Sequence, residues 1–139
     1  MATIAVRAAG GNRVRVLVRN GYDIKDALRA RGFKFDGLDK AWVAVVDRSD
    51  LVALAKEIRF AEGLGARMEA RLERDPWTTL IVAFEDILTR ANWREFIAAL
   101  AGITLYDYDH DRPGTEFGRT VPAPLTIGPE VPGNNPFER

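Results

Sequence analysis

The stretch YDIKDALRARGFKFDGLDKAWVAVV, residues 22–46, contains the clearest pattern in this chain of 139 residues. Apolar side chains at the i, i+3, i+4 spacing predict a helix over residues 24–31, with Asp23 as its N-cap and Gly32 at its end. Alternating aromatic and charged residues then predict a short strand, an acidic turn containing glycine, and a returning strand. These segments are 33–35, 36–40 and 41–46.

The segments on either side predict an α+β fold. Residues 2–19 alternate apolar and charged positions around a Gly-Gly-Asn turn, which indicates a β-hairpin with a buried valine face and an outer arginine face. Further apolar patterns predict helices over 50–60, from Pro76 to about residue 88 with Asp75 as the N-cap, and over 93–101, with strands at 66–74 and 103–108. Residues 66–74 could instead be helical, and the β-prone run 78–84 could instead be a buried strand. We therefore expect a small antiparallel sheet that begins with the hairpin and packs on several helices.

The expected domain organisation has three parts. Residues 1–62 form a β-β-α-β-β-α module, residues 63–112 form an extension of helices and strands, and residues 113–139 form an extended tail rich in proline and glycine. Apolar side chains spaced along the tail suggest that it docks on a protein partner; the alternative is a plain linker. The expected docking residues are Phe117, Leu125, Ile127 and Phe137.

The charge is balanced overall but divided unevenly along the chain. Residues 1–60 hold 12 Lys and Arg against 7 Asp and Glu, whereas residues 61–139 hold 8 against 13. This division suggests a polyanion-facing half and an acidic half that engages proteins, although the halves could instead complement each other. The sequence has no cysteine and no apolar run long enough to span a membrane, so we expect a cytoplasmic protein without membrane contact.

The central stretch resembles a known family. Tyr22, Lys25-Asp26-x-Leu28, Gly32-Phe33-x-Phe35-Asp36 and Lys40-Ala41-Trp42, followed by a capped helix, are similar to the HARP (HepA-related protein) domain of annealing helicases and to short phage and plasmid modules with the same signature. The resemblance covers about residues 14–60. It implies a DNA- or RNA-binding accessory without its own catalysis. The chain contains no GxxxxGK[ST] motor motif, so remodelling would need a separate partner.

Basic side chains of the first half are the candidate contacts to nucleic-acid phosphates. They lie off the expected apolar faces, although a solvated surface is the alternative for each of them. The set is Arg13, Arg15, Arg19, Lys25, Arg29, Lys34 and Lys40. Trp42 could stack on a base, but a tryptophan between apolar strand residues is more often in the core, where Phe33 and Phe35 are also expected.

We expect neither an enzyme nor a metal or cofactor site. His110 is the only histidine, and the alternating Asp107, Asp109 and Asp111 lack the glycine and final glutamate of a calcium-binding loop. The preferred hypothesis is a non-catalytic nucleic-acid-binding accessory, from a phage, plasmid or bacterium, that joins a larger protein complex through its tail. The alternative is a protein-interaction or assembly component, such as a virion part or a regulator of a larger machine, without nucleic-acid contact.

Overall fold

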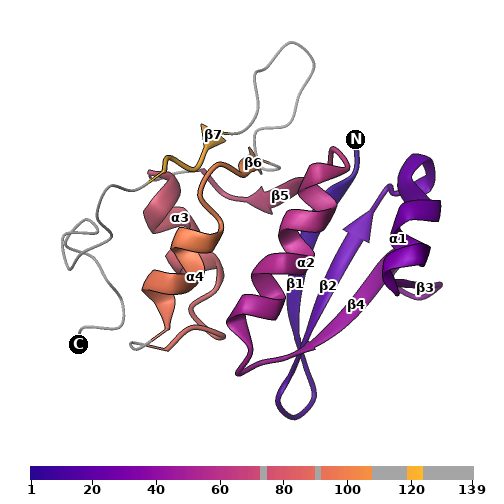
Figure 1. The fold of residues 1–139 in the computed structure, drawn as a ribbon, viewed down its shortest axis with the longest axis horizontal. Helices are drawn as coiled ribbons and strands as arrows, with labels where there is room; N and C mark the ends of the chain where they lie inside the picture. Colours follow the sequence, from indigo (N-terminus) through magenta and orange to yellow (C-terminus); the bar gives the residue numbers. More distant parts are fainter. Residues whose placement is uncertain (73–74, 90–91, 108–118, 124–139) are drawn as a thin grey trace. The chain divides into compact units, whose positions relative to one another are not determined.

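The computed structural model describes residues 1–72, 75–89, 92–107 and 119–123. These residues form seven β-strands and four α-helices, so the fold is α+β, as expected. The chain divides into two compact units, Met1–Met68 and Glu69–Arg139. Each unit is described separately below (Figure 1).

The sheet of the first unit is built on the predicted hairpin. Strand β1 (Thr3–Ala9) pairs antiparallel with β2 (Arg13–Arg19), and Gly11 in the turn between them has a positive φ of 71°. Strand β4 (Ala41–Asp47) pairs antiparallel with β2 along its whole length, and the short β3 (Lys34–Asp36) pairs antiparallel with β4. The strand order is therefore β3-β4-β2-β1, with β4 covered by β3 over three residues only.

Helix α2 (Leu51–Gly63) follows β4 and contacts β1, β2 and β4 (Figure 1). Its N-terminus is capped by the Asp50 side chain, which accepts a hydrogen bond from the backbone N–H of Ala53 at 3.0 Å. The helix carries the chain back so that β5 (Arg67–Ala70) begins parallel to β1. The prediction of a purely antiparallel sheet was therefore wrong, because a helical crossover returns the next strand in the same direction.

The two faces of this sheet differ as the alternation predicts. Val14, Val16 and Val18 are fully buried on one face, and the arginines of β2 project from the opposite face. The opposite face is not purely polar. Leu17 lies on it with only 1% of its surface exposed, in a cluster with three small or medium apolar side chains, Ala5, Ala41 and Val43.

The segment before β3 differs in detail from the prediction. Tyr22–Ile24 forms a 3-10 helix, η1, and α1 (Lys25–Arg31) begins after Ile24 without a side-chain cap, so the prediction of Asp23 as N-cap was wrong. Gly32 ends α1 with a φ of 110°, as expected for a C-terminal glycine. The backbone N–H of Phe33 then bonds to the Leu28 carbonyl, and its ring stacks on Phe60 at 6.4 Å between centroids.

The second unit contains α3 (Pro76–Ala83), α4 (Trp93–Ala99) and the antiparallel pair β6 (Thr104–Asp107) and β7 (Arg119–Thr120). The N-cap predicted at the start of α3 is confirmed, since Asp75 accepts from the backbone N–H of Thr78 at 3.0 Å. The helix ends at Ala83, five residues earlier than predicted. Phe84 instead packs edge-to-face on Phe96 of α4, with centroids 4.9 Å apart. The predicted docking residues Phe117, Leu125, Ile127 and Phe137 lie outside the described residues, as do Asp109, His110 and Asp111.

Candidate nucleic-acid interface

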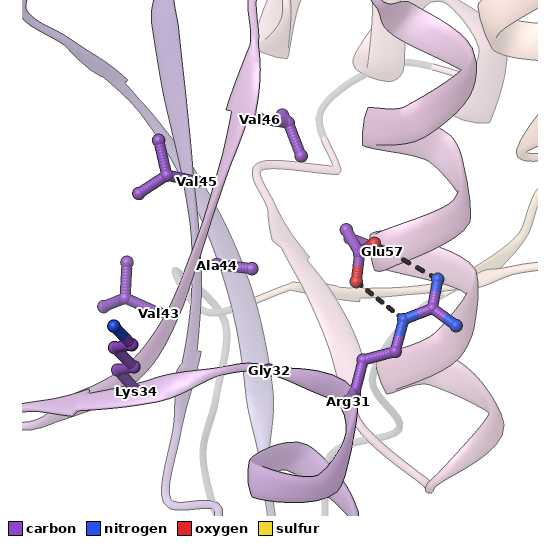
Figure 2. Close-up of a pocket in the computed structure, with 8 residues that line it drawn as sticks. All are labelled: Arg31, Gly32, Lys34, Val43, Ala44, Val45, Val46 and Glu57. Atoms are coloured by element: carbon purple, nitrogen blue, oxygen red, sulfur yellow. Dashed lines mark hydrogen bonds and ion pairs between the residues drawn. The ribbon is translucent and has the colours of Figure 1, made fainter.

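The seven predicted phosphate contacts are distributed over both sides of the first unit. Figure 2 shows the alternation on β4, with Val43 and Val45 pointing to the side of Lys34 and Val46 to the side of Glu57 on α2. By the strand register, Lys34 lies opposite Val43 and Arg15 opposite Val45, so both share the face away from α2. Arg13 and Arg19 share this face, whereas Lys25 and Arg29 belong to α1 and Lys40 to the turn before β4. The cations therefore do not gather on one side.

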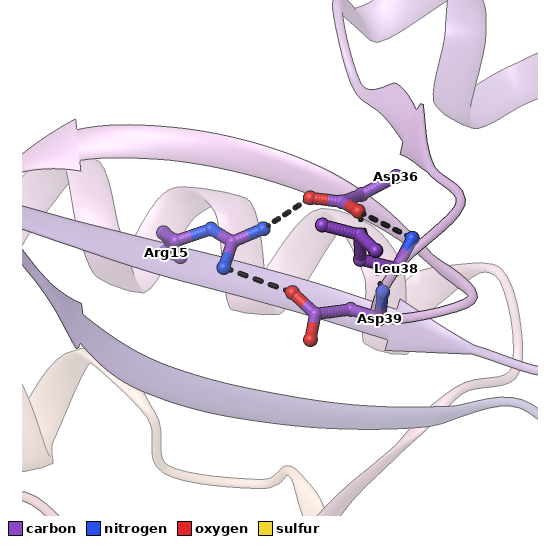
Figure 3. Close-up of polar contacts among 4 residues, drawn as sticks. All are labelled: Arg15, Asp36, Leu38 and Asp39. Atoms are coloured by element: carbon purple, nitrogen blue, oxygen red, sulfur yellow. Dashed lines mark hydrogen bonds and ion pairs between the residues drawn. The ribbon is translucent and has the colours of Figure 1, made fainter.

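On the face away from α2, Arg15 is engaged within the chain. Its Nη2 lies 2.7 Å from Oδ2 of Asp36, and its Nη1 lies 2.9 Å from Oδ2 of Asp39 (Figure 3). Because β4 lies between β2 and β3, the Arg15 side chain has to cross β4 to reach these carboxylates. A phosphate would have to compete with two carboxylates for this guanidinium, which makes Arg15 a weaker candidate than an unpaired cation.

Asp36 also organises the turn between β3 and β4. Its Oδ1 accepts the backbone N–H of Leu38 at 2.8 Å and that of Asp39 at 3.3 Å. The hydrogen bonds from Asp39 and Leu38, together with the positive charge of Arg15, hold the pKa of Asp36 below its ordinary value. The pairing of these two carboxylates with Arg15 depends on the register of three strands, so the sequence did not predict it.

Around α1, cations lie beside aromatic rings. The Nζ of Lys25 is 3.7 Å from the centroid of the Tyr22 ring, and the guanidinium carbon of Arg29 is 5.4 Å from the centroid of Trp42. Trp42 is 9% exposed, which confirms its expected place in the core, and its ring meets Phe35 edge-to-face at 5.5 Å. Phe35 itself is 58% exposed, so its expected place in the core was wrong.

Gly21 lies between the Lys25–Tyr22 pair and the Arg29–Trp42 pair, because it precedes Tyr22 and packs against Trp42. A Cβ at this position would lie 3.4 Å from Cδ1 of Trp42 and 3.2 Å from Cδ1 of Leu28, so the backbone just before Tyr22 packs closely on the Trp42 ring. The five side chains Tyr22, Lys25, Arg29, Phe35 and Trp42 are called the aromatic-basic strip below. Asp26 pairs with Arg29 of the strip at 3.8 Å, and both side chains are largely exposed.

Lys34 and Lys40 have no ion-pair partner among the residues that the structure describes. Both are exposed, and Lys40 has a positive φ of 51° at the end of the acidic turn. Arg19 is half-buried and already has a partner. The pKa of Asp47 is lowered mainly by two hydrogen bonds from Ser49 and, to a smaller extent, by the positive charge of Arg13. Lys34 and Lys40 are therefore more available to a phosphate than Arg13 and Arg19.

A second feature, the free edge of β4, was not foreseen from the sequence. Just after β4, the backbone N–H of Arg48 donates to the Asn12 carbonyl on the side of β2. Because the peptide groups of successive strand residues point in opposite directions, those of Val45 point away from β2, toward the side on which β3 lies. There β3 begins only at Lys34, opposite Val43, and Val45 has no strand partner in the described part of the chain. The 55% exposed Val45 borders two hollows, of about 350 and 450 Å³.

The smaller hollow is closed on one side by an ion pair between α1 and α2. The Arg31 guanidinium donates to both carboxylate oxygens of Glu57, at 3.0 and 3.1 Å (Figure 2). This bidentate pair joins the end of α1 to the middle of α2, and Arg31 also lies 4.9 Å from the centroid of Phe60. Arg31 is therefore committed to the fold rather than to a ligand.

No cluster of three or more acidic or histidine side chains that could hold a metal ion occurs within the described ranges. None of the helices that the structure describes combines the length and the apolar character needed to cross a bilayer. Comparisons with protein-family models, with curated proteins and with solved structures gave no significant match. The resemblance of residues 14–60 to the HARP family therefore stays a prediction.

Proposed function

We propose that the protein is a cytoplasmic, non-catalytic accessory that binds DNA or RNA through its first unit, within a larger protein complex. The aromatic-basic strip is the observation that carries this proposal. It places Lys25 beside the exposed Tyr22 ring and Arg29 beside the buried Trp42 ring, and cations next to aromatic side chains suit both the charge and the bases of a nucleic acid.

The charge of the first unit supports the same proposal. Residues 1–68 hold 13 Lys and Arg against 8 Asp and Glu, an excess of five positive charges. The ion pairs of Arg15 and Arg31 use acidic groups of this unit, which leaves Lys25, Lys34 and Lys40 for phosphates. Each phosphate that a cation neutralises releases bound counterions, so the affinity should fall with added salt.

The test is the salt dependence of binding to labelled single-stranded and duplex DNA of the same sequence, measured by fluorescence anisotropy. The variant Lys25→Gln/Lys40→Gln should reduce the slope of log K against log salt by about 1.4 to 1.8, from roughly 0.7 to 0.9 per phosphate contact. The control Lys56→Gln/Arg94→Gln removes the same charge from α2 and α4 and should leave the slope close to that of the unmodified protein. Equal slopes for all three proteins would refute phosphate contact by Lys25 and Lys40.

The free edge of β4 favours a second candidate function, a protein-interaction or assembly component without nucleic-acid contact. A partner strand could pair with the outward-facing peptide groups of Val45 and continue the line of β3. Absence of binding to either form of DNA at low salt would favour this candidate. Sedimentation analysis would then ask whether the protein self-associates and whether Val45→Lys, which places a charge on the edge, abolishes the association while Val52→Lys on α2 does not.

A further inference from the structure

The two most exposed aromatic side chains of the described residues both belong to the aromatic-basic strip. Tyr22 is 74% exposed and Phe35 is 58% exposed, whereas Phe33, Phe84, Phe96 and Trp93 are almost fully buried. An exposed ring leaves apolar surface in water, and two such rings next to cations mark a binding surface more clearly than a single ring does.

The Phe35 ring and the backbone next to Tyr22 both pack against Trp42. Phe35 meets the edge of Trp42 at 5.5 Å between centroids, which restrains the ring while leaving more than half of the residue accessible. Tyr22 begins the 3-10 helix η1 directly after Gly21, whose backbone packs against Trp42 and Leu28. A ring restrained as that of Phe35 is loses little conformational freedom when a flat ligand stacks on it.

The neighbouring charges indicate what that flat ligand carries. Lys25 lies against Tyr22, and Arg29 lies against Trp42, which is the ring that Phe35 contacts. The ligand should therefore combine planar rings with negative charge, which describes a nucleic-acid strand. A protein partner would match the rings, but it would need acidic side chains at two positions to match the cations.

On the basis of the function proposed above, we propose that the ligand is single-stranded nucleic acid and that its unpaired bases stack on Tyr22 and Phe35, while Lys25 and Arg29 neutralise phosphates beside them. In a duplex, the faces of each base are covered by the neighbouring base pairs. Aromatic side chains can therefore stack only on bases that are unpaired or at an end. This selectivity goes beyond phosphate binding, which duplex and single strand would share.

The experiment compares a 20-nucleotide single strand with its duplex, in one buffer, by fluorescence anisotropy. Tyr22→Ala and Phe35→Ala should each weaken single-strand binding by about tenfold and leave the weaker duplex binding unchanged. Tyr22→Phe should bind like the unmodified protein, because it keeps the ring. The control Leu38→Ala removes an exposed apolar side chain that lies outside the strip. Thermal unfolding of each variant shows whether the fold is intact.

The outcomes separate this inference from the proposed function. Salt-dependent binding to duplex that equals single-strand binding, and that Tyr22→Ala and Phe35→Ala leave unchanged, would overturn the stacking inference and leave phosphate binding in place. Absence of binding to both forms at low salt would overturn both and favour a protein partner. Loss of affinity in Phe35→Ala and equally in Leu38→Ala would also count against stacking, since it would show no preference for the ring.

Discussion

Replacing Leu17 with alanine should lower the free energy of unfolding by about 3 kcal/mol, within the usual range of about 2 to 5 kcal/mol for a buried leucine. The side chain is 1% exposed, although it belongs to the face that carries the arginines of β2. Losing its outer carbons costs about 0.8 kcal/mol for each methylene-sized group taken from water, and the cavity left behind adds to this cost. Two of its three cluster neighbours, Ala5 and Ala41, are alanines, which have no rotamers that could turn into the cavity.

The matched control is Val45→Ala on the same face. Val45 is 55% exposed, so this variant should cost about 0.5 kcal/mol or less. Urea unfolding, followed by circular dichroism, should show the midpoint of Leu17→Ala lowered by about 1 to 2 M with an unchanged m value. If Leu17→Ala and Val45→Ala shifted the midpoint equally, the face away from α2 would be open to water at Leu17 and our account of that cluster would be refuted.

Three further predictions concern local features of the two units. Gly32→Ala should cost about 1 to 2 kcal/mol by chemical denaturation, because a φ of 110° strains any residue with a Cβ; Gly37→Ala, which also has open space around its Cβ, should cost less than about 0.5 kcal/mol. Asp75→Ala should lower the thermal unfolding temperature through a loss of about 1 kcal/mol, whereas Asp75→Ser, which can still accept from Thr78, should keep most of the stability. The lowered pKa of Asp36 means that its carboxylate stabilises the folded state above its unfolded pKa and that this contribution disappears as the pH falls through the lower folded pKa. Acid unfolding should therefore depend less on pH in Asp36→Asn than in the unmodified protein, and an identical dependence would contradict the predicted effect of the turn hydrogen bonds.

Local patterns were enough to predict most elements of the first unit. The alternation in residues 13–19 predicted β2 and its buried valines, and the helical spacing predicted α1 and α2. Phe35 was assigned wrongly because alternation alone does not show that β3 lies at the edge of the sheet. By the register, Phe35 lies opposite the buried Trp42 and shares its face. Its 58% exposure therefore reflects its place on a three-residue edge strand and not the face on which it lies.

Interactions between distant segments could not be predicted from local patterns. Arg15 and Asp36 are 21 residues apart and meet only because β4 is placed between β2 and β3 in one register. The parallel start of β5 likewise depends on where α2 returns the chain. Both features depend on tertiary structure. The residues next to Arg15 and Asp36 in the sequence do not distinguish them from solvent-exposed charges, and the sequence of β5 does not distinguish a parallel strand from an antiparallel one.

The separation of the cations onto two sides decides where a polyanion would bind most strongly. On the face away from α2, the guanidinium of Arg15 is within 3 Å of two carboxylates, so a phosphate beside Arg15 would meet two negative charges. At the aromatic-basic strip, the ion pair between Arg29 and Asp26 is long and exposed, and water and salt weaken it. A phosphate can displace such a partner at low cost, and the neighbouring rings add attraction that salt does not screen. The strip is therefore the better position for a nucleic acid, even though the sequence placed more of the candidate arginines on β2.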